Sequence, residues 1–294
     1  MLPTRRDFLA CGTALAANAA PGYHPTLAAQ GYIWVQHFRL EKKPLDVAAA
    51  LAATRRAGFR RVELPVEFME PNVRGQTLHA LRKEELKLAA VSTTGPVHEP
   101  APAEKTITAT LELARTAKGG GAAALVFNAA PKPKDAPKSE AELAIQARSL
   151  DRLGAELNRL GLKLMIHQHS AEMAANAREW RYDLRHTDPR LVSFCVDVAW
   201  VRLGGQDTAA ILREAGPRLA GVHLRNLRGG IRTEAFGDGD IDYRAVARDL
   251  RAAGFRGFLV VELGYQPETK LTRSIEENLR LSRLFTQQVF AAGS

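Results

Sequence analysis

Short apolar runs that end on a potential metal ligand recur along the second half of the chain. Each run reads as a buried β-strand, and a helix-like stretch separates each one from the next. The four runs cover residues 163–169, 191–197, 219–223 and 258–262. They lie about 30 residues apart, which is typical of βαβ units. Parallel strands joined by helices bring their carboxyl ends to one side of a sheet, so the terminal His, Asp, His and Glu are expected to converge.

Four earlier apolar runs extend this pattern toward the N-terminus. We expect the first four strands at residues 32–36, 58–64, 86–91 and 122–127. The expected helices include residues 45–57, 104–117 and 139–160. Eight successive strand–helix units favour a single (β/α)8 TIM barrel over an open doubly wound sheet, and we place this barrel at residues 31–294.

The first thirty residues are expected to be a leader. Thr4-Arg-Arg-Asp-Phe-Leu9 resembles a twin-arginine export signal, and an Ala-rich, weakly apolar stretch follows it. Small-residue cleavage motifs occur at 17–19 and 27–29. The leader predicts export to the periplasm. No other stretch approaches the ~18 apolar residues that a bilayer span needs, so no membrane partner is expected.

The overall composition is that of an ordinary globular protein. The 294 residues are 46% hydrophobic and 25% charged, and the formal net charge is +9. The positive charges are dispersed over helix-like stretches, so we expect no nucleic-acid partner. The two cysteines cannot make a disulfide framework, because Cys11 lies in the leader and Cys195 in a buried strand. The composition leaves a homo-oligomer open.

The strand ends predict one divalent metal ion. Its expected ligands are His167 (or Glu172 as the alternative), Asp197, His223 and Glu262. A mixed nitrogen and oxygen ligand set suits Mn²⁺, Co²⁺, Fe²⁺ or Zn²⁺ better than Ca²⁺, with Mg²⁺ as a further option. Two of these residues also have structural interpretations: Asp197 could cap a helix, and Glu262 could make an ion pair.

Further side chains near the same strand ends are candidates for catalysis and substrate binding. His169 shares a strand face with His167, because residues two apart point the same way. The candidates for moving a proton are His169, Glu172 and Glu63. The candidates for substrate binding are Arg225, Trp200 and His37, the last of which follows the expected first strand.

From about residue 31 to about 285 the ordered motifs resemble the xylose-isomerase-like TIM barrels, also known as the sugar phosphate isomerase/epimerase family. The closest branch has a Tyr-His-Asn-His-x-x-Glu-Phe pattern at strand five, where this chain reads Ile166-His-Gln-His-Ser-Ala-Glu-Met173. Further matches are Val196-Asp-Val-Ala-Trp200, Gly204-Gly-Gln-Asp207, His223-Leu-Arg225, Gly237-Asp-Gly239 and Glu262. The resemblance implies a divalent metal at the ends of strands five to eight and a small sugar as substrate.

Three departures from the family bear on the reaction. The epimerases have Glu at the position of His167 and His at the position of Trp200, and the usual His-x-Lys-Asp reads His223-Leu-Arg-Asn226. One of the two carboxylates that move protons in epimerases is therefore absent, unless Glu172 replaces it. This difference modestly favours elimination or hydration over epimerisation as the expected reaction.

The sequence thus predicts a metal-dependent enzyme that acts on a sugar or ketosugar through an enediolate. It would be an isomerase, an epimerase, or a carbon–oxygen lyase or hydratase such as one acting on 3-keto-glycosides. Two alternatives remain open. One is a non-catalytic exported sugar-binding protein, and the other is a phosphodiesterase resembling endonuclease IV, which would fit the basic charge.

Overall fold

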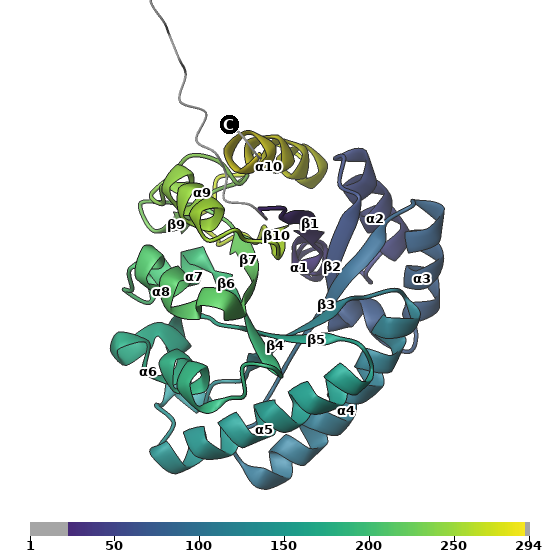
Figure 1. Cartoon of the computed structure of the whole chain (residues 1–294). Helices are drawn as coiled ribbons and strands as arrows, with labels where there is room; N and C mark the ends of the chain where they lie inside the picture. Colours follow the sequence, from purple (N-terminus) through teal and green to yellow (C-terminus); the bar gives the residue numbers. More distant parts are fainter. Residues whose placement is uncertain (1–22, 292–294) are drawn as a thin grey trace, which may run out of the picture.

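Eight parallel strands form a closed barrel in this computed structural model, which describes residues 23–291 (Figure 1). Their order around the barrel is β1-β10-β7-β6-β5-β4-β3-β2. The strands are β1 (Thr26–Gln30), β2 (Arg61–Pro65), β3 (Lys87–Gly95), β4 (Ala124–Ala129), β5 (Lys163–His167), β6 (Val192–Asp197), β7 (Leu219–Leu224) and β10 (Phe258–Val261). The predicted TIM barrel is confirmed.

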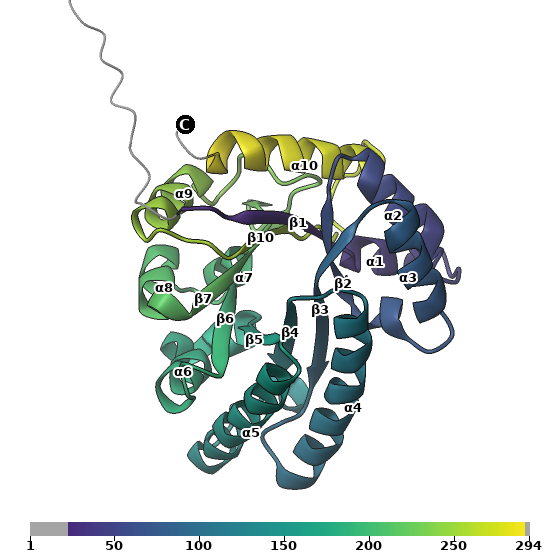
Figure 2. The same cartoon turned by 45° about the vertical axis from the view of Figure 1, so that its right-hand side comes forward.

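Helices surround this barrel on its outer face (Figures 1 and 2). They are α1 (Tyr32–Leu40), α2 (Val47–Arg56), α3 (Arg74–Lys83), α4 (Pro100–Gly119), α5 (Glu140–Arg159), α6 (Ser170–His186), α7 (Val198–Leu203), α8 (Thr208–Ala215), α9 (Tyr243–Ala252) and α10 (Ile275–Phe290). Three short 3₁₀ turns, η1 (Val66–Met69), η2 (Pro133–Asp135) and η3 (Gly216–Arg218), lie in the connections. None of the helices within residues 23–291 is long and apolar enough to cross a bilayer.

The helices are placed by their caps and their apolar stripes. In α5 the Ser139 side chain accepts a hydrogen bond from the backbone of Glu142, whose carboxylate accepts one from Ser139 in return. Leu143, Leu150 and Leu157, each two turns from the next, are fully buried against the strands. Burial of such stripes holds each helix against its strand and so fixes where the strand ends.

The barrel interior follows the two-residue period of each strand. The side chains that fill the middle of the barrel are apolar and mostly small: Ala90, Ala124, Val126, Met165 and Cys195. Cys195 is buried there and behaves as a small apolar residue. The next inward position along each strand is polar, so the apolar filling gives way to functional groups at the carboxyl ends.

The first strand was predicted wrongly. Residues 32–36 belong to α1, and the strand that closes the barrel is β1, four of whose residues pair with β10. The barrel therefore begins at Thr26 rather than at residue 31, and the cleavage motif at 27–29 is part of a barrel strand. The alanine-rich β1 carries a weak strand signal, whereas Tyr32-Ile-Trp-Val35 is aromatic and β-branched like a strand. Arg5, Arg6 and the cleavage motif at 17–19 lie outside the described residues.

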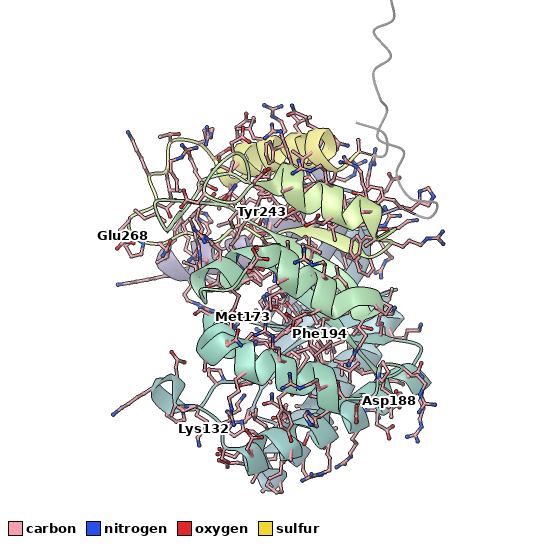
Figure 3. All side chains as sticks on the ribbon, turned by 60° about the vertical axis from the view of Figure 1, so that its left-hand side comes forward. Lys132, Met173, Asp188, Phe194, Tyr243 and Glu268 are labelled. Atoms are coloured by element: carbon pink, nitrogen blue, oxygen red, sulfur yellow. The ribbon has the colours of Figure 1, made fainter. Side chains whose placement is uncertain are left out.

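Figure 3 shows the two ends of the barrel from the side. Lys132, after β4, and Glu268, after β10, lie at one end, whereas Asp188, before β6, lies at the other. The end with Lys132 and Glu268 is thus the carboxyl-terminal mouth, where active sites of TIM barrels occur.

Candidate active site

A cavity of about 520 Å³ opens at the carboxyl-terminal mouth. Its wall contains the polar strand-end side chains Gln30, Glu63, Ser92, Thr94, Asn128, His167, His223 and Glu262. A slightly larger cavity of about 600 Å³ lies at the amino-terminal ends of β5, β7 and β10, beside Lys163, Leu219 and Phe258. We assign function to the smaller cavity, because the convergent polar groups are there.

Four side chains at this mouth form one compact group. His167, Asp197, His223 and Glu262 each offer a ligand atom, and these atoms lie within 4.8 Å of one another. All four residues are buried. His223 is opposite Asp197 in the β6–β7 pairing and opposite Val260 in the β7–β10 pairing, so strand register brings the group together. The strand ends therefore converge in the structure, as the sequence predicted.

Arg225 joins the two carboxylates of this group. Its Nη2 lies 2.6 Å from Asp197 Oδ2 and 2.6 Å from Glu262 Oε1. The other Asp197 oxygen, Oδ1, accepts hydrogen bonds from the backbone of Ala199 and Trp200 and caps α7. Asp197 therefore caps a helix with one oxygen, while its other oxygen faces the group and stays a candidate metal ligand.

Burial and neighbouring charges act in opposite directions on these carboxyls. Burial disfavours the charged form of Asp197, but Arg225 and His167 outweigh it and lower the pKa of this carboxyl to about 2. Burial acts the same way on Glu262, and Arg225 and His223 hold the pKa of its carboxyl well below the ordinary value. Both groups are thus anionic at neutral pH.

His223 lies between two carboxylates. Its Nδ1 is 2.5 Å from Glu262 Oε2, and its Nε2 is 3.2 Å from Glu63 Oε2. Burial favours the neutral ring. Nearby Cys195, Glu63 and Glu262 outweigh it and hold the pKa of His223 well above its ordinary value. A metal ion on this ring would take the place of a proton.

The residues present fit a divalent metal ion. Two imidazoles and two carboxylates make a nitrogen and oxygen donor set that transition metals accept. The buried His167 Nε2 has no hydrogen-bond partner and lies 3.7 Å from Asp197 Oδ2. A buried nitrogen without a partner is costly, and coordination would satisfy it. His167, rather than Glu172, is the strand-five member of the compact group.

The three candidates for moving a proton lie in two kinds of environment. Glu63 and His169 both line the cavity, and Glu63 Oε1 is buried without a partner. Burial and the nearby His167 lower the pKa of His169 to about 3, so its ring is neutral at pH 7. Glu172 instead caps α6: its Oε2 accepts from the His169 backbone at 2.9 Å and its Oε1 from Asn128 at 3.3 Å.

His37 does not lie with the other predicted residues. It is on helix α1, is not among the cavity-lining residues, and has its Nε2 3.4 Å from Glu41 Oε1. The structure leaves His37 out of the cavity wall because residues 32–36 form a helix, not a strand that ends at the mouth. Tyr32, at the start of that helix, lines the cavity instead.

The model of the family described as xylose isomerase-like TIM barrel matches residues 51–284. The chain belongs to this family.

Relatives within and around the family carry several activities. Inosose dehydratase from Clostridium perfringens is 29% identical over 147 residues, which are 44% of this chain and 50% of the relative. The chain thus matches about half the length of these curated relatives. The D-allulose 3-epimerase of Methylomonas sp. has the same fold, with a TM-score of 0.72 at 17% identity over 91% of this chain and 98% of that one. The 3-keto-D-glucoside 4-epimerase of E. coli gives 0.70 at 15% identity, over 90% and 99%.

Arg232 is among the cavity residues of this family member that the sequence reasoning missed. Arg232 lines the cavity from a two-stranded antiparallel ribbon, β8 (Leu227–Arg228) and β9 (Ile231–Arg232). Gly229 and Gly230 connect the strands, with φ angles of +60° and +79°. Two glycines in this left-handed conformation form a tight hairpin turn, and the Gly-Gly pair was the available signal.

Asn226 supports this ribbon. Its amide nitrogen donates to the carbonyls of Gly237 and Ile241 at 2.8 and 3.1 Å, and its Oδ1 accepts from the backbone of Leu227 and Ile241. An Asp at this position could not donate the first two bonds. The exchange of the family's usual Asp for Asn therefore has a structural reason in this chain.

Trp200 lines the cavity as expected, but its ring already has partners. The guanidinium carbons of Arg225 and Arg232 lie 5.4 and 4.8 Å from the ring centroid, and the His169 ring lies edge-on at 5.2 Å. These contacts hold the two arginines by cation–π attraction. If Trp200 bound a substrate through its ring face, the substrate would compete with these contacts.

Proposed function

We propose that this protein is a divalent-metal-dependent enzyme that acts on a ketosugar through an enediolate. The observation that carries the proposal is the buried group of two imidazoles and two carboxylates beside a cavity large enough for a sugar. The relatives named as dehydratases and epimerases support this class of reaction. His167, Asp197, His223 and Glu262 would hold the metal.

The chain's own residues would bind the substrate and move its proton. A bound divalent metal would supply Lewis acidity for the carbonyl oxygen and its neighbouring hydroxyl. Glu63 and His169 face the cavity from β2 and from the end of β5, on parts of the barrel separated by β3 and β4. One would take the proton from the carbon next to the carbonyl, and the other would stand near the oxygen that leaves or is reprotonated.

Elimination or hydration is the favoured outcome of this chemistry. The strand-five position that holds a carboxylate in the epimerases holds His167 here, and Glu172 is committed to capping α6. The site therefore lacks a second free carboxylate at strand five. A single base beside a Lewis acid suffices for loss of a β-hydroxyl or glycosidic oxygen.

Proton NMR in D₂O tests the proposal directly. With Mn²⁺, Co²⁺ or Zn²⁺ added, we expect deuterium to replace the hydrogen on the carbon next to the carbonyl of a 3-keto-glycoside or a free ketose. Treatment with a chelator should stop the exchange. Binding of the sugars without exchange, with every metal, would instead make the protein a sugar-binding protein.

We also propose that the protein is exported to the periplasm, on the basis of Arg5 and Arg6 ahead of an Ala-rich stretch. Replacing both by Lys keeps the charge but removes the paired guanidinium groups. The Arg5→Lys, Arg6→Lys variant is expected to stay in the cytoplasmic fraction of cells that deliver the unaltered protein to the periplasm. Equal periplasmic delivery of both proteins would contradict the twin-arginine pathway.

A further inference from the structure

Arg232 is held in the cavity wall by its backbone and by Trp200. Its N–H donates to Gln266 Oε1 at 2.7 Å, and its carbonyl accepts from Thr269 Oγ1 at 3.1 Å. The guanidinium lies 4.8 Å above the Trp200 ring. The side chain is therefore positioned before any substrate arrives, which lowers the entropic cost of binding a ligand.

The guanidinium of Arg232 lacks an anionic partner among residues 23–291. Its Nε is buried without a hydrogen-bond partner, and no carboxylate lies within ion-pair distance of it. Arg225, by contrast, has both Asp197 and Glu262. An arginine stays charged at any physiological pH, and a partly buried charge without a partner is unfavourable. An anion in the cavity would remove that penalty.

The rest of the cavity wall is chemically different. On the β1 to β4 side the polar groups include the neutral Gln30, Ser92 and Asn128, which suit sugar hydroxyls, and the carboxylates Glu63 and Glu67, which can accept hydrogen bonds from hydroxyls. The unpartnered positive charge is confined to the ribbon side, where β9 contributes Arg232. A ligand that complements this wall carries hydroxyls at one end and a negative charge at the other.

We propose that Arg232 binds a carboxylate of the substrate, so that the substrate is a sugar acid; this inference rests on the ketosugar chemistry proposed above. A single guanidinium presents a planar pair of donors that matches the two oxygens of a carboxylate. A phosphate dianion has three oxygens to satisfy, and the second arginine in this wall is already engaged by Asp197 and Glu262. The carboxylate therefore fits the available donors better.

Calorimetric titration with matched ligands tests this subsite without requiring turnover. The probes are D-glucuronate and D-galacturonate, their neutral amides, and glucose 6-phosphate. We expect the acids to bind the wild-type protein roughly 10- to 100-fold more tightly than the amides, the range for a hydrogen bond to a charged group. Arg232→Gln should bring each acid to the affinity of its amide. Arg232→Lys should restore only part of the difference, because it lacks the planar donor pair.

Arg228→Gln is the matched control. Arg228 is on the same ribbon but is exposed, and its Nη2 donates to the Asp238 carbonyl. This variant should keep the wild-type preference for the acids. Retained amide binding in Arg232→Gln shows that the cavity is still intact.

Several outcomes would overturn the subsite. They are equal binding of acids and amides by the wild-type protein, no binding of either acid, a preference that survives Arg232→Gln, and a preference for the phosphate that depends on Arg232. Failure of the proposed function is distinguishable. If neutral ketosugars exchange deuterium but the acids bind no more tightly than their amides, only the carboxylate subsite is removed. If the acids bind more tightly in a way that depends on Arg232 but no keto acid exchanges deuterium, only the enediolate chemistry is removed.

Discussion

Glu262→Gln is expected to lose bound metal and to reduce turnover by roughly 10³-fold or more, along with solvent exchange at the substrate carbon. The substitution preserves the volume of the side chain and removes its charge. Glu262 Oε1 faces Arg225 at 2.6 Å and Oε2 faces His223 at 2.5 Å. The neutral amide would therefore leave two buried cations with one carboxylate fewer. A divalent ion bound in the same place would have one fewer negative charge around it and would be held less tightly.

Metal content by mass spectrometry, read beside kcat, checks this expectation. Breaking a buried ion pair typically destabilises by roughly 3–5 kcal/mol, so a thermal melt must show that the variant is folded. Glu179→Gln is a matched control, because Glu179 pairs with Lys138 and Gln146 between α5 and α6, away from the cavity. It should lose stability but keep its metal and its rate. A folded Glu262→Gln protein with a full complement of metal would remove Glu262 from the ligand set.

The convergence of the compact group of four candidate metal ligands was predictable because it depends on two simple periodicities. Parallel strands end on one side, and residues two apart share a face. His167, Asp197, His223 and Glu262 each follow an apolar strand, so their meeting requires only the correct count of strands from β5 onward. The misplacement of the first strand left these four unaffected, because each was placed from its own apolar run.

The residues that were misplaced depend on features outside those periodicities. His37 was placed at the mouth only because α1 has the aromatic and β-branched composition of a strand. Arg232 reaches the cavity from a ribbon of two-residue strands, which are too short to show any alternation. Glu172 is close in sequence to His167. Only its hydrogen bond with the His169 backbone shows that its carboxylate is already used to cap α6. The hydrophobic pattern of a sequence does not show which polar side chains are already engaged in local hydrogen bonds.

Replacing His169 by Gln is expected to leave metal content unchanged and to lower kcat by roughly 10²–10⁴-fold, the usual cost of removing a positioned general base or acid. His169 lines the cavity at the start of α6, one step beyond His167, and is not part of the four-residue metal group. Its ring lies edge-on to both His167 and Trp200, at 5.0 and 5.2 Å between centroids. Its ring therefore lies between His167 of the compact group and Trp200 of the cavity wall. His186→Gln, at the exposed far end of α6, is the matched control and should keep the wild-type rate.

The same measurements on Glu63→Gln decide which of the two groups takes the proton. Glu63 also lines the cavity, and its Oε1 is free of partners. Loss of the base should stop deuterium exchange and turnover together, whereas loss of the acid that serves the leaving oxygen should slow turnover while exchange continues. A His169→Gln protein that loses its metal makes His169 a ligand and leaves Glu63 as the base. One that keeps both its metal and its full rate removes His169 from the mechanism.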